Sequence, residues 1–338
     1  MSDVDPANTV PAPAQSPAEA GGAPAFHTPR PGSGPVPTAA PDAAHPARQR
    51  APGQFRPRLR HRARLGRVFA VTCLLATLVG VVVLAVLLVD ILRDGASRLN
   101  GRFLTGIPSR LTERAGVAPA LAGSAWILAL TALVGFPLGV GTALWLEEYA
   151  PDNRFRRFVE TNISNLAGVP SIVYGILGLA VFVRALSLGR SVLSAALTLT
   201  LLVLPVIIIG AQEAIKAVPN SIRLGAYALG ATRWEAIRHQ VLPLALPGIL
   251  TGTILAVSRA VGEAAPVIMV GALGFIAFVP NSPGDAYTVI PFQIYSWVSR
   301  PQAEWKELAA AASLVLLALL LTMNAAAIYL RNRFSRRY

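Results

Sequence analysis

Charged residues are scarce in this chain. Asp, Glu, Lys and Arg make up 14% of the 338 residues, whereas hydrophobic residues make up 54%. Because a soluble globular protein carries about 25% charged residues, this composition excludes an ordinary soluble domain and favours a membrane protein. Lysine is nearly absent: Lys216 and Lys306 are the only two, so arginine provides most of the positive charge behind the formal net charge of +13.

Cysteine is almost absent as well. Cys73 is the single cysteine, and a lone cysteine cannot form an internal disulfide. The four histidines, His27, His45, His61 and His239, do not pair at the spacing of metal ligands. The sequence therefore predicts neither a disulfide framework nor a metal site.

Patterns that mark common catalytic sites are missing too. The chain has no G-x-x-x-x-G-K-[ST] phosphate-binding loop, so it cannot hydrolyse ATP by itself. The absence of HExxH, G-x-S-x-G and clustered carboxylates argues against a membrane enzyme. The basic residues lie mainly outside the apolar runs, so membrane topology explains the net charge and we expect no nucleic-acid partner.

The N-terminal segment differs from the remainder of the chain. Residues 1–66 are rich in Pro, Ala and Arg, and thirteen of the 27 prolines fall in the first 57 residues. Such a segment buries too little apolar surface to fold. We predict a disordered, basic cytoplasmic tail over 1–66, followed by a transmembrane domain over 67–338. The arginines of the tail set the membrane topology or contact anionic lipid headgroups, and the two roles are compatible.

Six apolar runs are long enough to cross a bilayer, which takes about 20 residues. They cover residues 68–92, 120–146, 163–186, 191–211, 246–278 and 308–330. The sequence therefore predicts an all-α membrane protein with about six transmembrane helices. The fifth run would be about 50 Å long as one helix, so we expect a break at Pro266, Gly271 or Gly274.

The distribution of Lys and Arg predicts the orientation. If the N-terminus lies in the cytoplasm, the cytoplasmic segments hold 20 of these residues and the outer segments hold nine. We therefore expect a multi-pass protein of the plasma membrane with both termini inside.

The connection between the fourth and fifth runs, residues 213–245, is polar but carries apolar residues at helical spacing. Pro219, Gly230 and Pro243 punctuate it. This pattern predicts two or three short amphipathic helices on the cytoplasmic side, which would lie on the membrane or dock into a partner.

The same loop resembles the cytoplasmic loop of ABC importer permeases. That family has Glu-Ala-Ala, three residues, Gly, nine residues and Ile-x-Leu-Pro. This chain has Leu224, Gly225 and Ala226, then Gly230, with Gln240 in place of Ile before Leu242 and Pro243. The resemblance implies that the loop docks as a coupling helix into the ATP-hydrolysing subunit. Leu224 stands where the family usually has Glu, which removes one polar contact to that subunit.

Four further segments resemble the PstA-type permeases of bacterial phosphate importers, which are type I ABC importer permeases. These segments are residues 146–151, 165–175, 259–266 and 303–305. The resemblance implies import of inorganic phosphate with no cofactor bound to this chain, since the partner subunits use the ATP. It also implies three kinds of partner: a second permease subunit in a heterodimer, two ATP-binding subunits and an extracytoplasmic phosphate-binding protein.

Arg259 and Glu263 interrupt the fifth apolar run. A charged side chain at the bilayer centre costs about 2.5–3.5 kcal/mol on insertion scales, so neither should face lipid. Being four residues apart, they share a helix face and can pair. Two interpretations stay open: a buried ion pair that fixes helix packing, or a pair on the substrate path. In the second, Arg259 meets the anion in transit and Glu263 neutralises it at rest.

Other polar and aromatic residues have simpler expected roles. Glu147 and Glu148 end the second run and are expected to be solvated at the interface. Trp297 and Trp305 are expected in an aromatic belt at the membrane surface.

Four alternatives remain. The first is a permease for another oxyanion, such as sulfate or molybdate, or for amino acids. The second is a secondary transporter, which predicts gradient-driven uptake and usually internal repeats, although the two halves of this chain show no convincing repeat. The third is the membrane enzyme considered above. The fourth is an additional role in reporting phosphate supply to a sensor kinase.

Overall fold

The computed structural model describes residues 59–334. These residues form helices and connecting segments, with no strand among them, so the predicted all-α fold is confirmed. The longer helices are α1 (Leu59–Ala96), α3 (Ala118–Leu144), α4 (Arg154–Ala167), α6 (Val192–Lys216), α9 (Leu242–Val261) and α12 (Ala303–Phe334). The shorter α-helices are α2 (Gly101–Thr105), α5 (Ser171–Gly178), α7 (Asn220–Ala228), α8 (Arg233–Ala236), α10 (Ala265–Val270) and α11 (Ile290–Val298).

Short turns of other helical types extend or join these elements. One is a 3₁₀ turn, η1 (Thr112–Arg114), and three are π-helical: η2 (Trp145–Tyr149), η3 (Leu179–Ala185) and η4 (Ile237–Val241). The π-turns continue α3, α5 and α8 without a break in the helical backbone. Insertions of this kind change the direction in which the following side chains point.

The chain divides into two units, residues 1–69 and residues 70–338. Helix α1 begins at Leu59, so the last residues of the predicted tail are helical. Residues 1–58 of that tail lie outside the described residues. Within the second unit, α1 is exposed up to Asp90, and Gly95 near its end packs against the backbone of Ala310 in α12.

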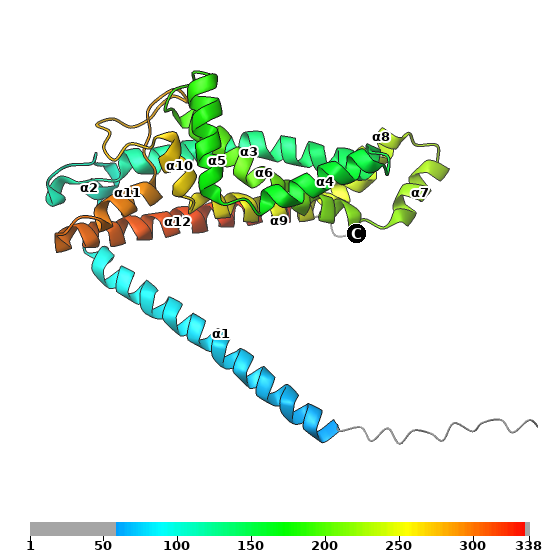
Figure 1. Ribbon diagram of the computed structural model, residues 1–338, viewed down its shortest axis with the longest axis horizontal. Helices are drawn as coiled ribbons and strands as arrows, with labels where there is room; N and C mark the ends of the chain where they lie inside the picture. The colour runs from blue at the N-terminus through cyan, green and yellow to red at the C-terminus, as the bar shows by residue number, and fades with distance from the viewer. Residues whose placement is uncertain (1–58, 335–338) are drawn as a thin grey trace, which may run out of the picture. The chain divides into compact units, whose positions relative to one another are not determined.

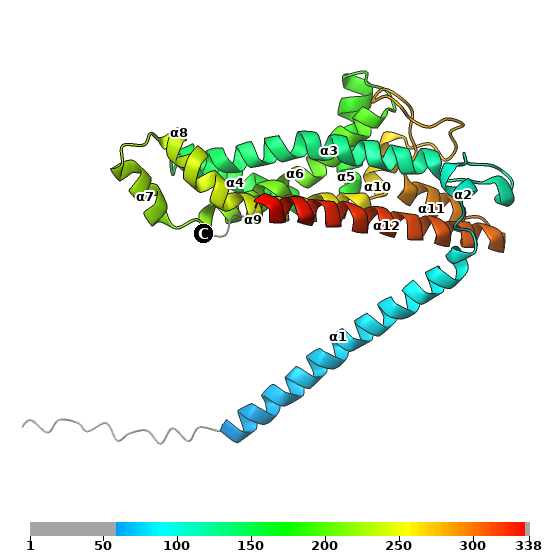
Figure 2. The same ribbon diagram turned by 180° about the vertical axis from the view of Figure 1, so that it is seen from behind.

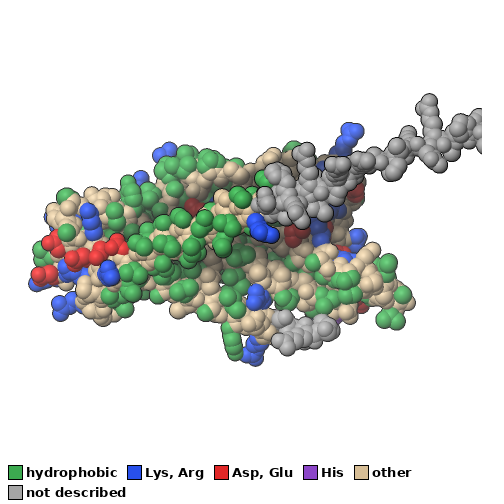
Figure 3. Space-filling view, turned by 90° about the horizontal axis from the view of Figure 1, so that it is seen from below, with side chains coloured by type: hydrophobic (Ala, Val, Ile, Leu, Met, Phe, Trp, Pro, Cys, Tyr) green, Lys and Arg blue, Asp and Glu red, His purple; other side chains and the backbone are tan. Residues whose placement is uncertain are grey.

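Five helices are long and apolar enough to cross a membrane, and a bent pair makes a sixth span. They run over Leu65–Ala96, Ala118–Tyr149, Val192–Lys216, Arg233–Val261 and Ala303–Arg333, and the bent pair joins Arg154–Ala167 to Ser171–Ala185. Hydrophobic side chains cover much of the face drawn in Figure 3, and acidic and basic side chains gather at its left-hand end. The structure therefore confirms about six transmembrane helices.

Helices α3, α6, α9 and α12 form the centre of the second unit and run side by side (Figure 1). Gly135 and Gly139 of α3 face Ile207 of α6. Small residues one turn apart let two helix backbones come together. Pro137 lies inside α3 between the two glycines.

The third predicted span is not a straight helix. Helices α4 and α5 meet at an angle of 103°, because Gly168 ends α4 and Pro170 precedes Ser171, the first residue of α5. Proline cannot continue a helix from the preceding turn, and the residue before it is forced into an extended conformation. The break leaves Leu166 and Ser171 beside the middle of α6, where they help to line a small cavity.

The predicted boundaries of the fifth span, 246–278, are wrong. The apolar helical segment begins at Arg233 and ends at Val261, and Gly262 caps α9 before the expected break points are reached. Helix α10 then ends at Gly271, which has a φ of +118°. Two prolines near the start of the span do not interrupt it: Pro243 lies just after the π-turn η4, and Pro247 lies inside α9.

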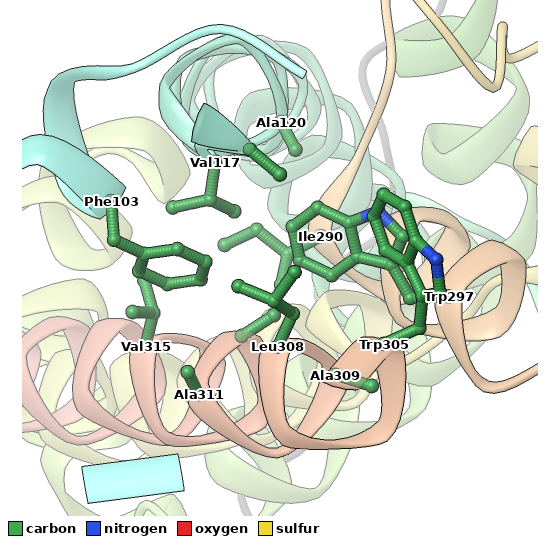
Figure 4. Close-up of a cluster of buried hydrophobic side chains, with 12 residues drawn as sticks. Phe103, Val117, Ala120, Ile290, Trp297, Trp305, Leu308, Ala309, Ala311 and Val315 are labelled. Carbon is green, nitrogen blue, oxygen red and sulfur yellow. The ribbon is translucent and has the colours of Figure 1, made fainter. Parts of the chain in front are cut away.

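Helices α2 and α11 and the start of α12 lie at the opposite end of the second unit from α7 and α8 (Figures 1 and 2). Phe103, Trp297 and Trp305 form an aromatic group in a buried cluster there (Figure 4). The prediction that both tryptophans belong to a surface belt is wrong, because they fill the space between α2, α11 and α12. The guanidinium of Arg300 lies 3.8 Å from the centre of the Trp305 ring, a cation–π contact.

We expect Gly139→Ala to destabilise the contact between α3 and α6. A Cβ at position 139 would lie 2.5 Å from Ile207 Cγ2, and such overpacking costs about 1–3 kcal/mol. Thermal unfolding of the purified chain in detergent measures the change in Tm. Gly141→Ala is the matched control, since a Cβ there meets nothing within 4 Å. Equal Tm values for the two variants would contradict this packing.

Candidate functional site

Arg223 of α7 joins three elements at the α7 end of the second unit. Its Nη2 donates to Glu148 Oε1 at 2.7 Å and to the Ile215 carbonyl at 3.0 Å. Its Nη1 donates to the Val218 carbonyl at 2.7 Å. Glu148 belongs to η2 at the end of α3, whereas Ile215 lies in the last turn of α6 and Val218 just after that helix. One guanidinium therefore binds a carboxylate and caps a helix C-terminus together.

Glu147 holds a second set of polar partners in the same region. Its Oε1 accepts a hydrogen bond of 2.8 Å from Gln212 of α6 and lies 3.5 Å from the ammonium of Lys216. Arg156 of α4 approaches its other oxygen at 3.6 Å. The π-turn η2 places two consecutive carboxylates against different elements.

The expectation that Glu147 and Glu148 are solvated is wrong. Their side chains are 9% and 6% exposed. A carboxylate can be buried to this extent only when cations and hydrogen-bond donors compensate its charge. Arg223, Gln212 and Arg156 provide that compensation here. These three residues and the two carboxylates form a group that we call the charge cluster.

Exposed apolar side chains lie along α7, along α8 and in the turn between them. Leu224, Tyr227, Leu229 and Trp234 all project from this loop, and Leu229 is 91% exposed. Ala226 is half-buried and Gly225 exposed. Several large exposed apolar residues in and beside a connection between spans are typical of a surface that binds another protein.

The turn between α7 and α8 depends on Gly230. Its φ is +84°, a left-handed conformation that glycine adopts without strain. After the turn, Thr232 and Glu235 cap α8 reciprocally: the Thr232 hydroxyl accepts from the Glu235 N–H, and the Glu235 carboxylate accepts from the Thr232 N–H. These two features fix where Leu229 and Trp234 stand relative to each other.

The predicted loop 213–245 is shorter in the structure than expected. Residues 213–216 finish α6, and the segment from Arg233 onward belongs to the helical span that continues into α9. Leu242 and Pro243 therefore lie in the first turn of α9, where Leu242 packs against a buried apolar cluster. Residues 217–232 form the connection itself.

Arg259 and Glu263 form the predicted pair. Arg259 Nε lies 3.6 Å from Glu263 Oε1, and the two side chains are 64% and 20% exposed. Glu263 lies beyond the end of α9, so a turn rather than a continuous helix brings the two residues together. Because most of the Arg259 side chain remains exposed, the pair does not bury Arg259 within this chain.

Arg259 is level with the middle of the neighbouring helices, although it lies near the end of α9. The residues packed around its helical turn include Leu128 of α3, Val203 of α6 and Leu320 of α12. Val203 lies near the middle of α6, and Leu320 near the middle of α12. Arg259 also lines a small cavity with residues at the α4–α5 break and in α6, namely Leu166, Ala167, Val169, Ser171, Tyr174, Leu202, Val203 and Val206.

Residues 135–338 match the family described as the binding-protein-dependent transport system inner membrane component. The chain belongs to this family. It is a type I ABC importer permease, as its resemblance to that family implied.

Relatives from several bacteria are similar to the permease. It is 38% identical over 183 residues to a probable ABC transporter permease, YqgI, of Bacillus subtilis (strain 168), in a match that covers 54% of this chain and 62% of the relative. YqgH of the same organism is 35% identical over 234 residues, with 65% and 74% covered. The phosphate transport system permease PstA 1 of Mycobacterium tuberculosis (strain CDC 1551 / Oshkosh) is 33% identical over 222 residues, with 66% and 72% covered.

Solved structures share the fold at low sequence identity. A subunit of a bacterial alginate ABC transporter in complex with a periplasmic protein has a TM-score of 0.61, with 82% of this chain and 99% of that chain covered at 16% identity. A chain of the inward-facing MetNI methionine ABC transporter has a TM-score of 0.53, with 64% and 97% covered at 20% identity. At these identities the likeness shows the fold of the permease alone.

Sequence reasoning missed the charge cluster. Two adjacent carboxylates at the end of an apolar run, with an arginine in the following polar loop, were the available signal, because buried carboxylates need such partners. The pairing of Glu148 with Arg223 joins residues 75 positions apart, and sequence spacing does not show which arginine is close.

We expect Gly230→Ala to strain the turn between α7 and α8 in the permease. A Cβ at position 230 meets nothing within 4 Å, so the effect arises from the left-handed backbone, at about 1–2 kcal/mol. Hydrogen exchange of residues 220–236 should become faster. Gly225→Ala also meets open space but lies inside α7, and we expect slower exchange there. Unchanged exchange in Gly230→Ala would show that the turn tolerates a side chain.

Proposed function

We propose that the permease moves inorganic phosphate into the cell as part of an ATP-driven importer. The complex contains a second permease subunit, two ATP-binding subunits and an extracytoplasmic phosphate-binding protein. ATP is bound and hydrolysed by the partner subunits, and this chain needs no cofactor of its own. Both termini lie in the cytoplasm, so the loop with α7 and α8 faces the ATP-binding subunits.

The main observation behind this proposal is that the Arg259 side chain is largely exposed. At mid-depth of the bundle it is too costly to face lipid, and this chain covers only part of it. A second permease subunit laid against this side would enclose Arg259 in a polar path between the two. Several relatives named as PstA phosphate permeases, from Mycobacterium tuberculosis, Haemophilus influenzae and Xylella fastidiosa, support phosphate as the anion.

The chemistry of the pair suits transit better than tight binding. A guanidinium stays protonated and offers several donors to phosphate oxygens. Glu263, 3.6 Å away, competes with the anion for those donors and neutralises Arg259 when the path is empty. The competition weakens the site, which lets the anion leave as readily as it enters. The small cavity beside Arg259 lies at the break between α4 and α5.

In this proposal, the apolar surface of α7 and α8 is the docking surface for an ATP-binding subunit. Leu224 replaces the usual Glu of the family, and Leu224, Leu229 and Trp234 are all exposed. An apolar contact therefore takes the place of a polar one at this position. The charge cluster lies behind this surface and fixes α7 to the spans.

Uptake of radiolabelled phosphate tests the substrate. Deleting the gene should remove ATP-dependent uptake, and restoring it should return uptake that excess phosphate competes for but sulfate, molybdate and amino acids do not. Competition by one of the other solutes would assign the permease to that solute. Uptake that persists without ATP and follows an ion gradient would instead indicate a secondary transporter.

Arg259→Ala should lower phosphate uptake by about 10–100-fold, the loss expected when a charge-assisted hydrogen bond is removed. Uptake into cells measures it, with the amount of assembled complex as the reference. Arg184→Ala is the control, since Arg184 is an exposed arginine at the end of η3. Unaltered uptake with normal assembly would place Arg259 outside the path and leave helix packing as the role of the pair.

Leu229→Asp should detach the ATP-binding subunit. A charge at this 91% exposed position must be desolvated in an apolar contact, and loss of a central contact of this kind weakens binding by at least about tenfold. Co-purification with the tagged permease measures the amount of ATP-binding subunit retained. Leu111→Asp changes an equally apolar exposed residue before α3 and should retain it. If both variants retain the subunit, the docking surface for the ATP-binding subunit lies elsewhere.

A further inference from the structure

We propose that Arg223 is a positioning residue that transmits movement of α7 to α3 and α6, and that its contact with Glu148 is required for ATP hydrolysis to drive transport. This inference rests on the proposed function. It assigns to the charge cluster the connection between the docking surface for the ATP-binding subunit and the spans. Neither the exposed apolar surface nor Arg259 provides that link.

Helix α7 packs against α8 and η4, but it has few attachments to α3 and α6 besides Arg223. None of its nine residues, all within the described part of the chain, is fully buried. Ile222 packs partly against the apolar cluster at the end of α6, and most of the remaining side chains point outward. A helix packed this weakly against α3 and α6 would move without them when a partner pushed it. The contacts of Arg223 therefore decide whether α3 and α6 follow.

The guanidinium is suited to this because it binds two spans together. Glu148 continues α3 through η2, and the Ile215 carbonyl belongs to the last turn of α6. Arg223 Nε and Nη2 both donate to Glu148 Oε1, at 3.0 and 2.7 Å. The side chains of Arg223 and Glu148 are 16% and 6% exposed, so water does not readily replace either partner. A displacement of α7 must then carry the ends of α3 and α6 with it, or break a buried ion pair.

The other charges of the region do not duplicate this link. Glu147 binds Arg156, Gln212 and Lys216, so it joins η2 to α4 and α6 and leaves α7 untouched. Arg233 at the start of α8 lies over the ring of Tyr149, 5.1 Å from its centre, which ties α8 rather than α7 to η2. In the described part of the chain, Arg223 is the charged group that joins α7 to α3 and α6.

The test uses the full complex in liposomes and measures phosphate imported per ATP hydrolysed. Glu148→Gln and Arg223→Gln should lower this ratio by about fivefold or more, within the range by which coupling residues act, while the ATP-binding subunit still co-purifies and hydrolyses ATP. Arg223→Lys should also lower the ratio, because an ammonium lacks the planar fork that reaches Glu148 and both carbonyls. Asp152→Asn is the control, since it breaks a 3.6 Å pair with Arg157 that is 70–78% exposed.

Exchanging the charges of Arg223 and Glu148 tests whether an ion pair between them is enough, or whether the contacts of Arg223 with the carbonyls are also needed. In the double variant Arg223→Glu, Glu148→Arg, the new carboxylate faces the carbonyls of Ile215 and Val218, so we expect no recovery of the ratio. Recovery to the wild-type value would overturn the proposal that Arg223 joins α7 to both α3 and α6. A wild-type ratio in both Glu148→Gln and Arg223→Gln would overturn it as well.

A distance measurement covers the case in which a variant does not support transport at all. Spin labels at Glu213→Cys and Ala228→Cys, with Cys73→Ser to remove the single native cysteine, report the position of α7 against α6. We expect a narrow distance distribution with Glu148 present and a broad one in Glu148→Gln. An equally narrow distribution in Glu148→Gln would show that packing alone holds α7. If the wild-type complex hydrolyses no ATP or imports no phosphate, the proposed function fails before this link is tested.

Discussion

The cost of placing charge in a hydrocarbon environment governs this structure. Away from water, an ionised side chain must have a partner or face a polar space. Few of the residues in the long spans are charged, and Glu147 and Glu148 at the end of one span are bound by other groups. Glu147 and Glu148 show the constraint most clearly, because both are nearly buried and each is held by its own donors. The positions of α4, α6 and α7 follow from those donors.

The same constraint gives two regions of the permease different chemistry. These regions are the α7 end of the second unit and the mid-depth of the spans. At the α7 end, charge is paired within the chain, which makes a stiff connection behind an apolar surface. At mid-depth, Arg259 is only loosely paired and largely uncovered, which leaves its donors open to another group. In the proposed function, the first region is the firm connection to the ATP-binding subunit and the second is the weak site that the anion passes.

The sequence alone predicted the class of protein well and the contacts less well. Apolar runs of sufficient length located the spans, and the Leu224 to Pro243 pattern located the loop, since both depend on local composition. The start of the fifth span at Arg233 was missed because a capped helix and a π-turn carry polar residues into it. Trp297 and Trp305 were placed at the membrane surface, but packing against Phe103 buries them. Glu148 and Arg223 could not be paired from spacing, because the fold brings them together from different helices.

Purification of the tagged wild-type permease from its own membrane, with identification of the proteins that accompany it, tests the central claim most directly. The account predicts an ABC ATP-binding subunit and a second, different permease subunit in stoichiometric amounts. A chain that purifies alone and transports without ATP would contradict the account, and the pair of Arg259 and Glu263 would then belong to a gradient-driven carrier.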